Sequence, residues 1–316
     1  MSATPACRAC GQPRSRLEGS RRRPSAPEPF HYFRCAACGF LFVEPVTPDS
    51  VYDDAYYDGR GVDPTVNYRA EYEHYARTDR IHEFNDLLRL ATCHLSRSDA
   101  PPGTGPVRWL DFGCGAGGLL KFLRDQRTVD SATGPRPLEL VGSDVGSYSD
   151  RLRREDGFQI LAPGELAALP DGTFDLISAI EVLEHIAHPA PVLRLLARLL
   201  KPGGFLLLTT GNLASPMARW KGLDFSYCMP EIHVSLFSPA TLNRLYADAG
   251  LVPERVRYRG VLRFKILKSA GSDRRRRLLR GALRFPGFRR LVDLLYGTSA
   301  MPCARKPLAT PTIVRA

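Results

Sequence analysis

The 316-residue sequence predicts a doubly wound α/β domain that follows a small cysteine-rich module. From Val107 onward, short apolar segments with the length of strands alternate with amphipathic helical segments. A glycine-rich turn follows the first of these strands, and two Cys-x-x-Cys pairs precede the whole region. Strand–helix alternation with continuous apolar strands is typical of a parallel sheet that helices cover on both faces.

Each element of this domain is predicted from hydrophobic spacing and from its boundary residues. We expect strands at Val107–Phe112, Leu138–Ser143, Phe158–Leu161, Phe174–Ile180 and Phe205–Thr210. We expect helices at Ala116–Gln126, Pro191–Leu200 and Thr241–Gly250, the last of them capped by Ser238. Two final strands are predicted at Val256–Phe264 and Ala300–Lys306, separated by two short basic helices within Arg274–Leu295.

The first 45 residues carry two close cysteine pairs, Cys7 with Cys10 and Cys35 with Cys38. In a reducing compartment such pairs bind a metal ion more often than they form disulfides. Four thiolates suit a tetrahedral Zn²⁺ ion in a closed, structural site. We therefore predict a zinc-binding, ribbon-like module over residues 1–45, with a lapsed or redox-active site as the alternative.

The rest of the chain divides into a helical lead-in over residues 46–105 and a main domain over residues 106–316, with a basic helical insertion at about 266–296. Within the N-terminal module, the polar stretch Arg14–Pro29 predicts a loop, and the apolar residues around the second cysteine pair predict a β-hairpin. Tyrosines recur at helical spacing in the lead-in. They fit either an amphipathic helix that packs on the main domain or a lid that approaches a ligand.

Composition and charge exclude several classes of protein. Hydrophobic residues make up 44% and charged residues 24%, which is an ordinary globular balance. We find neither a secretory signal nor an apolar run long enough to span a membrane, so we expect a cytoplasmic protein. Of the 44 lysines and arginines, 17 lie after residue 251, against 3 of the 33 acidic residues. A nucleic-acid groove would spread the net charge of +11 more widely, so no nucleic-acid partner is expected.

The segment DFGCGAGG, from Asp111 to Gly118, follows a predicted strand and opens a helix. Glycines permit a tight turn and a close approach of ligand to backbone, while the helix start offers free N–H donors. The spacing also satisfies the dinucleotide pattern GxGxxG, which alone leaves a dinucleotide open. However, Asp111 would repel a pyrophosphate and attract an ammonium, and Asp144 at the end of the second strand can accept both ribose hydroxyls. These features favour a nucleotide-type cofactor that carries an ammonium group.

Four segments in order carry a specific resemblance: DFGCGAG, the strand-ending Asp144, FDLISAIEVLEHIAHP and LLKPGGFLLLTT. Together they resemble class I S-adenosylmethionine-dependent methyltransferases over about residues 107–316. The CxxC…CxxC pattern followed by Tyr-Tyr-Asp resembles a bacterial subgroup with an N-terminal zinc module, which is met among sugar, polysaccharide and natural-product methyltransferases. The resemblance implies a Rossmann-like, mostly parallel sheet of seven strands whose last strand is antiparallel.

The resemblance also implies roles for individual residues in binding S-adenosylmethionine. The loop residues and the acidic strand ends would contact the methionine end, the ribose, the adenine or the methyl-transfer pocket. The implied cofactor residues are Asp111, Gly113, Gly115 and Gly117 in the loop, Asp144 for the ribose, Glu165 and Leu166 beside the adenine, and Glu181 at the transfer pocket. Many relatives carry an aspartate where this chain has Pro163-Gly164-Glu165, so a role for Glu165 as a helix cap stays open.

Methyl transfer from a sulfonium mainly requires that the acceptor be held in line, and a hydroxyl, amine or carbon acceptor can also require a general base. His185 and His233 are the candidate catalytic residues, although each also fits a packing role. By family analogy the acceptor is a sugar or another small natural product, and O-, N- and C-methylation all stay open.

Two other functions are kept as alternatives. Zinc modules and basic tails also occur in RNA methyltransferases, and a cofactor fold can serve as a non-catalytic binding module. The basic run Arg274–Arg277 and the helices after it fit either a weak contact with an anionic surface or an ordinary solvated face.

Overall fold

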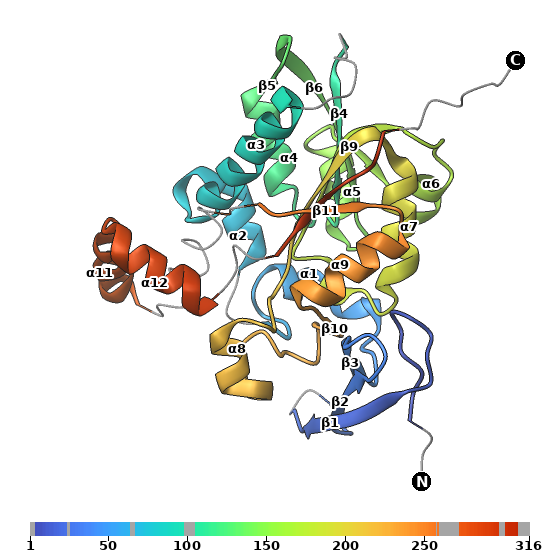
Figure 1. Ribbon diagram of the computed structural model, residues 1–316. Helices are drawn as coiled ribbons and strands as arrows, with labels where there is room; N and C mark the ends of the chain where they lie inside the picture. The colour runs from blue at the N-terminus through green and yellow to red at the C-terminus, as the bar shows by residue number, and fades with distance from the viewer. Residues whose placement is uncertain are drawn as a thin grey trace, which may run out of the picture.

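The computed structural model describes residues 4–23, 26–63, 67–97, 105–256, 258, 272–296 and 301–308. Its centre is an eight-stranded sheet in the order β11-β12-β9-β8-β4-β6-β5, with β7 also paired to β6 (Figure 1). The strands are β4 (Val107–Phe112), β5 (Thr128–Ser131), β6 (Gly134–Ser143), β7 (Gln159–Leu161), β8 (Phe174–Ile180), β9 (Leu200–Thr209), β11 (Val252–Glu254) and β12 (Cys303–Arg305).

The strand directions confirm a mostly parallel sheet with an antiparallel last strand. β4 runs parallel to β6 and β8, β6 to β7, and β8 to β9, whereas β12 is antiparallel to both β9 and β11. Within the described residues the sheet has eight strands, one more than the seven that the resemblance implies. Residues 128–143 form a hairpin in which β5 pairs antiparallel with an extended β6, because Gly134 at φ 103° supplies a turn that the apolar pattern does not reveal.

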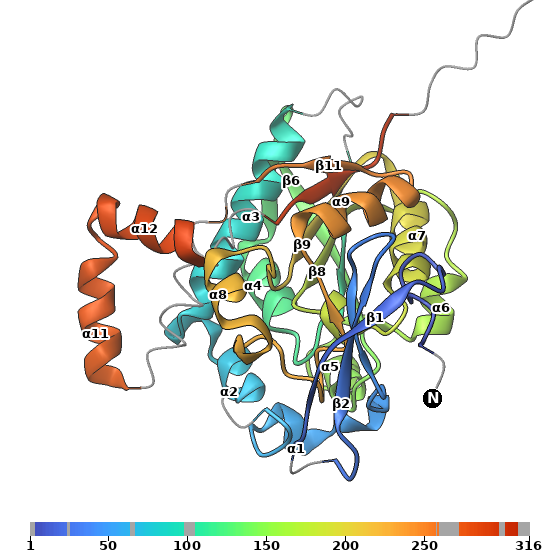
Figure 2. The ribbon, with the colours of Figure 1, turned by 60° about the horizontal axis from the view of Figure 1, so that its bottom comes forward.

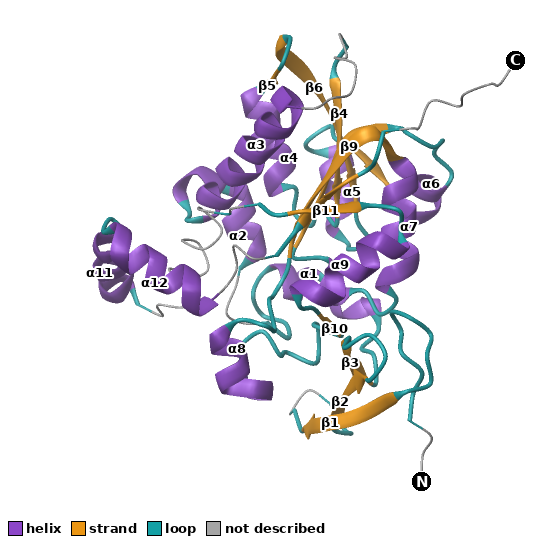
Figure 3. Ribbon diagram, in the orientation of Figure 1, coloured by secondary structure: helices purple, strands orange, loops and turns teal. Residues whose placement is uncertain are grey.

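Helices cover both faces of this sheet (Figure 3). α3 and α4 pack on one face, against β5, β6 and β9, while α7 and α9 pack on the other. The helices of the main body are α3 (Arg80–Arg97), α4 (Gly118–Gln126), α5 (Tyr148–Arg154), α6 (Pro163–Ala167), α7 (Pro189–Leu199), α8 (Pro216–Lys221) and α9 (Pro239–Asp248). The Ser238 hydroxyl accepts the N–H of Thr241 and caps α9, as the sequence predicts.

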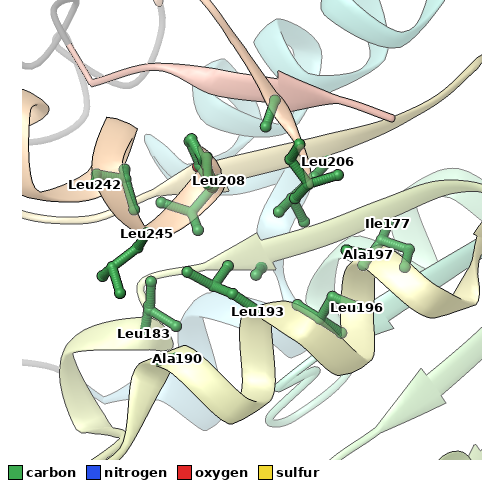
Figure 4. Packing of buried hydrophobic residues seen from close by; sticks show 14 of the residues in the cluster. Ile177, Leu183, Ala190, Leu193, Leu196, Ala197, Leu206, Leu208, Leu242 and Leu245 are labelled. Carbon is green, nitrogen blue, oxygen red and sulfur yellow. The ribbon is translucent and has the colours of Figure 1, made fainter. Parts of the chain in front are cut away.

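The largest hydrophobic cluster lies between the sheet and the pair α7 and α9. Figure 4 shows Leu193 and Leu196 of α7 facing the strand residues Ile177 and Leu206, with Leu245 of α9 beside them. Each fully buried leucine contributes about 1.5–3 kcal/mol relative to an exposed one. The site at the strand ends therefore rests on a rigid, closely packed base.

The N-terminal residues form a second, smaller sheet in the order β1-β2-β3-β10. Its strands are β1 (Ser15–Arg21), β2 (Phe30–Cys35), β3 (Leu41–Glu44) and β10 (Ser235–Leu236). β2 and β3 form the predicted hairpin, and β10 comes from the main domain to pair antiparallel with β3. The segment that carries His233 is therefore tied directly to the N-terminal sheet.

The prediction of a loop over Arg14–Pro29 is wrong, because its first half is strand β1. β1 is held by polar cross-strand pairs, with Arg34 Nε 2.6 Å from Glu18 Oε2 and Ser20 Oγ 2.7 Å from His31 Nδ1. Such pairs stabilise a strand without burying an apolar face, so the hydrophobic pattern gives no sign of it.

The lead-in contains α1 (Asp54–Tyr57) and α2 (Tyr68–Glu73), followed by the long helix α3. Its tyrosines stack on one another, with the rings of Tyr56 and Tyr68 5.1 Å apart, and they pack around the glycine loop. Figure 2 shows α1 and α2 at the same end of the molecule as the start of β2. The lead-in therefore covers the loop region rather than standing apart from it.

Near the C-terminus, α11 (Asp273–Ala282) and α12 (Pro286–Tyr296) are the two predicted basic helices, and they meet at Pro286. Most of the strand expected at Val256–Phe264 lies outside the described residues. Among the described helices, none has the length and apolar character needed to cross a bilayer.

Candidate active site

The glycine loop leaves the end of β4 through three residues with left-handed backbone. Gly113, Gly115 and Gly117 have φ values of 72°, 51° and 76°, which glycine adopts without steric cost. A side chain at Gly113 would clash with Val182, which follows β8. The loop therefore lies directly under the segment after β8, and α4 begins only at Gly118, once the turn is complete.

Asp144 faces this loop from the end of β6. Its carboxylate accepts the N–H of Gly115 at 2.9 Å on Oδ2 and the N–H of Gly146 at 2.7 Å on Oδ1. The hydroxyl of Tyr57, from α1, donates to Oδ1 at 3.3 Å. Two loops and one lead-in helix thus converge on a single carboxylate.

Asp111 lies behind the loop, at the end of β4, with its side chain buried. Its Oδ1 accepts the hydroxyl of Ser178, from β8, at 2.7 Å. Burial raises the pKa of the Asp111 carboxyl to about 7, because no full positive charge offsets the loss of water. The carboxylate would therefore gain from a cation brought to the loop.

The two residues predicted beside an adenine lie on α6. The carboxylate of Glu165 is exposed and accepts the N–H of Ala162 at 2.7 Å, which caps the start of that helix. Leu166 is fully buried in the large cluster between the sheet and α7. Their assignment to cofactor binding stays a prediction.

A second group of polar residues lies at the ends of β8 and β9. Glu181 has a left-handed backbone with φ 53°, a strained conformation that is rare outside glycine. The hydroxyl of Tyr227 lies 3.2 Å from Glu181 Oε2 and in closer contact with Glu184 Oε1. Thr210, just after β9, donates to Glu184 Oε2 at 2.8 Å. Four residues from three chain segments thus form one hydrogen-bonded cluster.

His185 and His233 lie together beside this cluster, with their ring centroids 5.0 Å apart. The Nδ1 atom of His185 is 2.8 Å from the hydroxyl of Tyr52. The Nδ1 atom of His233 is 2.6 Å from the carbonyl oxygen of Tyr227. Because a carbonyl can only accept, Nδ1 of His233 carries the proton, and Nε2 is the basic nitrogen of the neutral ring.

The buried ionisable groups here have pKa values far from their usual ranges. Burial, with the nearby charge of Glu181 adding to it, raises the pKa of Glu184 to about 8. Burial, with a smaller effect from the adjacent His233, lowers the pKa of His185 to about 3. At neutral pH Glu184 therefore holds a proton and His185 is uncharged.

The four cysteines of the N-terminal module come together as predicted from their spacing. The Sγ atoms of Cys7 and Cys38 are 3.6 Å apart and those of Cys10 and Cys35 are 3.7 Å apart, and none forms a disulfide. All four Sγ atoms lie within 4.8 Å of one another, a spacing that suits a tetrahedral ion. Glu184, His185 and His233 also bring one possible ligand atom each within that distance of one another.

Comparison with known proteins identifies the family. The model of the methyltransferase domain family matches residues 71–256, which is more than half of the chain and includes the loop, Asp144 and both histidines. The chain belongs to this family. It is a class I S-adenosylmethionine-dependent methyltransferase.

Curated relatives of this methyltransferase are named ubiquinone biosynthesis O-methyltransferases. The protein from Burkholderia pseudomallei (strain 1710b) is 29% identical over 180 residues, covering 54% of this chain and 75% of the relative. The protein from Pseudomonas aeruginosa (strain LESB58) is 31% identical over 142 residues, covering 42% and 57%. Both similarities leave about half of this chain unmatched.

Solved structures resemble the methyltransferase in fold alone. An S-adenosylmethionine-dependent methyltransferase from Archaeoglobus fulgidus has 18% sequence identity and a TM-score of 0.45, covering 76% of this chain and 98% of the other. The [4+2]-cyclase SpnF has 22% identity and a TM-score of 0.46, covering 84% and 98%.

The residues of this methyltransferase fit S-adenosylmethionine on structural grounds. At Gly113 and Gly118 the space that a side chain would fill is taken by Val182 and Tyr72, so glycine lets these two segments lie close to the backbone of the loop. Asp111 is a buried carboxyl that an ammonium would stabilise in its charged form, and Asp144 is already oriented by two backbone N–H groups.

Sequence reasoning missed several side chains that the structure brings into this region. Ser178 and Thr210 lie within the quoted family segments but received no role, and Tyr227 lies outside them. All three reach the site because strands and loops far apart in sequence meet there. Tyr52 and Tyr57 stood out in the sequence only as tyrosines of the lead-in, and the structure places them in contact with His185 and Asp144.

Proposed function

We propose that this methyltransferase transfers the methyl group of S-adenosylmethionine to a hydroxyl of a small-molecule acceptor, with His233 as the general base. The hydrogen bond between His233 Nδ1 and the Tyr227 carbonyl carries this proposal, because it fixes Nε2 as the proton-accepting atom. The same bond helps to stabilise the imidazolium that forms when Nε2 takes up the acceptor's proton.

The cofactor would be held by the glycine loop and the carboxylates around it. Asp111 would pair with the ammonium, Gly113, Gly115 and Gly117 would leave room for the methionine end, and Asp144 would accept the ribose hydroxyls. When bound, S-adenosylmethionine supplies an electrophilic methyl group on a positively charged sulfur. Glu165 and Leu166 are proposed beside the adenine on family resemblance alone.

The acceptor would lie against the cluster of Glu181, Glu184 and Tyr227. Because Glu184 is protonated at neutral pH, it can donate a hydrogen bond to an acceptor oxygen as well as receive one. His185, neutral and held by Tyr52, is proposed to orient the acceptor rather than to take its proton. Holding the hydroxyl in line with the methyl group is the larger contribution to rate.

A small-molecule acceptor is consistent with the names of the curated relatives, which are O-methyltransferases of ubiquinone biosynthesis. The resemblance of the N-terminal module to sugar and natural-product enzymes extends the class to glycans and polyhydroxylated compounds. A hydroxyl acceptor is common to all of these.

We also propose that Cys7, Cys10, Cys35 and Cys38 hold one structural zinc ion. Their closeness without disulfides supports it. A shell of four thiolates leaves no position for water or substrate, so the ion would stabilise the module and take no part in the reaction.

Replacing His233 tests the proposed base. Formation of S-adenosylhomocysteine is first measured against a panel of hydroxylated aromatic compounds and sugars, which selects the acceptor. His233→Gln is then expected to lower kcat by about 10²–10⁴-fold and to remove the dependence of kcat on deprotonation of a base.

Calorimetry should give an unchanged Kd for S-adenosylmethionine in this variant, and His31→Gln on β2 serves as the matched control with full turnover. Wild-type turnover by His233→Gln would remove His233 as the base. An acceptor methylated only on nitrogen or carbon would overturn O-methylation.

A further inference from the structure

The helical hairpin of α11 and α12 forms a strongly basic projection at the side of the molecule. Figures 1 and 2 both place it outside the main body, joined to it near α8. The described side chains on the two helices and the turn between them include eight arginines, of which all but Arg276 are exposed. They are Arg274, Arg275, Arg276, Arg277, Arg280, Arg284, Arg289 and Arg290.

The same hairpin exposes large apolar side chains. Phe285 and Leu294 are each 68% exposed, as is Leu278. The hairpin already has a small core of its own, in which Leu283 and Val292 are buried. Leu278, Phe285 and Leu294 therefore take no part in the buried core between the two helices.

α8 extends this apolar character beyond the hairpin. Its Trp220 is 80% exposed, and α8 packs against α12. Scattered single apolar residues are normal on a protein surface, whereas several large ones on adjoining elements mark an interaction site.

We propose that α8, α11 and α12 form a docking surface for an anionic phospholipid membrane. Arginines on such a surface are attracted to the negative headgroups, while Phe, Leu and Trp side chains enter the boundary between headgroups and acyl chains. Charge complementarity selects the anionic lipid, and the apolar side chains select a bilayer over an RNA, which would use the arginines alone.

This docking surface is connected to the proposed acceptor site along the chain. In the sequence, α8 lies between Thr210, which donates to Glu184, and Tyr227, which contacts Glu181 and Glu184. When the protein is bound to a membrane through α8, one wall of the proposed acceptor site would therefore lie near the bilayer. Membrane binding is independent of the proposed methyl transfer and is tested without any acceptor.

The test is co-sedimentation of the full chain with vesicles of phosphatidylcholine, alone or with about 30 mol% phosphatidylglycerol. We expect binding to the anionic vesicles to be at least about tenfold stronger and to weaken as salt is added. Arg289→Ala with Arg290→Ala should weaken it by about tenfold or more, and Phe285→Ser with Leu294→Ser should weaken it by about tenfold.

The matched control is Arg16→Ala with Leu17→Ser on β1, which removes an exposed charge and an exposed leucine elsewhere and should bind like the wild type. Unchanged melting temperatures show that all variants are folded. Equal binding to neutral and anionic vesicles, or none to either, would overturn the proposal.

Two further results would also overturn it. One is homopolymer RNA binding that needs the arginines, together with vesicle binding that ignores Phe285 and Leu294. The other is a dimer in sedimentation velocity that the Phe285 and Leu294 changes dissociate while vesicle binding is unaffected.

Discussion

At the scale of single residues, the site depends on carboxyl groups that are kept away from water. Asp111 and Glu184 are buried, and each is paired with hydroxyl groups rather than with a cation. A hydroxyl stabilises a carboxylate less than a guanidinium or ammonium does, so burial raises both pKa values. Both carboxyl groups are costly when charged, so Asp111 would gain from a positive ligand and Glu184 keeps its proton at neutral pH.

The pH dependence of stability should reveal this cost at Asp111. Its pKa of about 7 in the folded chain lies above the usual value of 3.8, so the folded state binds the proton more tightly. The stabilisation is complete below about pH 4 and is lost as the pH rises to about 7. Relative to Asp111→Asn, the free energy of unfolding of the wild type should fall by up to about 1.4 kcal/mol per pH unit in this window.

Urea unfolding at intervals across the window measures this difference. The same substitution at the exposed Asp130 is the control and should leave the pH dependence unaltered. Parallel curves for the wild type and Asp111→Asn would mean that the carboxyl is ionised throughout.

At the scale of elements, α1 lies over the glycine loop and contacts Asp144. Tyr57 donates to Asp144 Oδ1, and the next loop approaches α1 through Ser147 Oγ, 2.7 Å from Asp54 Oδ1. The ring of Tyr72, on α2, lies against Gly118. The tyrosines of the lead-in thus pack on the main domain, as one interpretation predicts. Tyr57 and Tyr72 also lie close to the glycine loop, where the other interpretation places a lid.

We expect the hydroxyl of Tyr57 to compete with the cofactor's ribose for Asp144. Tyr57→Phe removes the hydrogen bond from Tyr57 to Asp144, which the ribose would otherwise have to displace. Such a bond is worth about 0.5–1.5 kcal/mol. Calorimetry should therefore show S-adenosylmethionine binding about two- to tenfold more tightly. Tyr75→Phe, which loses a contact with Asp125 instead, is the control. Weaker binding by Tyr57→Phe would identify Tyr57 as a cofactor ligand instead of a competitor.

At the scale of the whole molecule, the N-terminal residues share one hydrophobic core with the methyltransferase fold. Cys35, Phe40 and Phe42 belong to the same cluster as Leu193 and Leu245. β3 also pairs with β10, two residues after His233. A structural change at the four cysteines would therefore reach the segment that carries His233.

Removing the proposed zinc ion should lower both stability and turnover. We expect about one zinc per chain by mass spectrometry, and its loss on prolonged chelation or in Cys10→Ser. The melting temperature and kcat should then fall, while the Kd for S-adenosylmethionine changes less, because the glycine loop lies on β4 and α4. Cys93→Ser on α3 should keep the metal and the activity. A protein that contains no zinc and is unaffected by chelation would contradict this.

The sequence was sufficient where a structure is set by local pattern. β8 falls at the predicted Phe174–Ile180, and Ser238 caps α9. It was insufficient where distant segments meet: nothing near Tyr227 indicates that its hydroxyl will contact two glutamates more than forty residues earlier. β1 was missed for a related reason, because its polar residues are stabilised by partners on β2 and on the main domain, such as Asp224 for Arg21.

The N-terminal sheet contacts residues that come about 200 positions later in the chain, and this separation affects how the chain folds during synthesis. The hydroxyl of Tyr32 bonds to the carbonyl of Cys228, 196 residues later. At typical rates of translation that separation takes roughly 10–40 seconds to make. Throughout that interval the apolar residues of β2 and β3 lack the partner strand and the loop that bury them, so the nascent chain must remain unaggregated until β10 has left the ribosome.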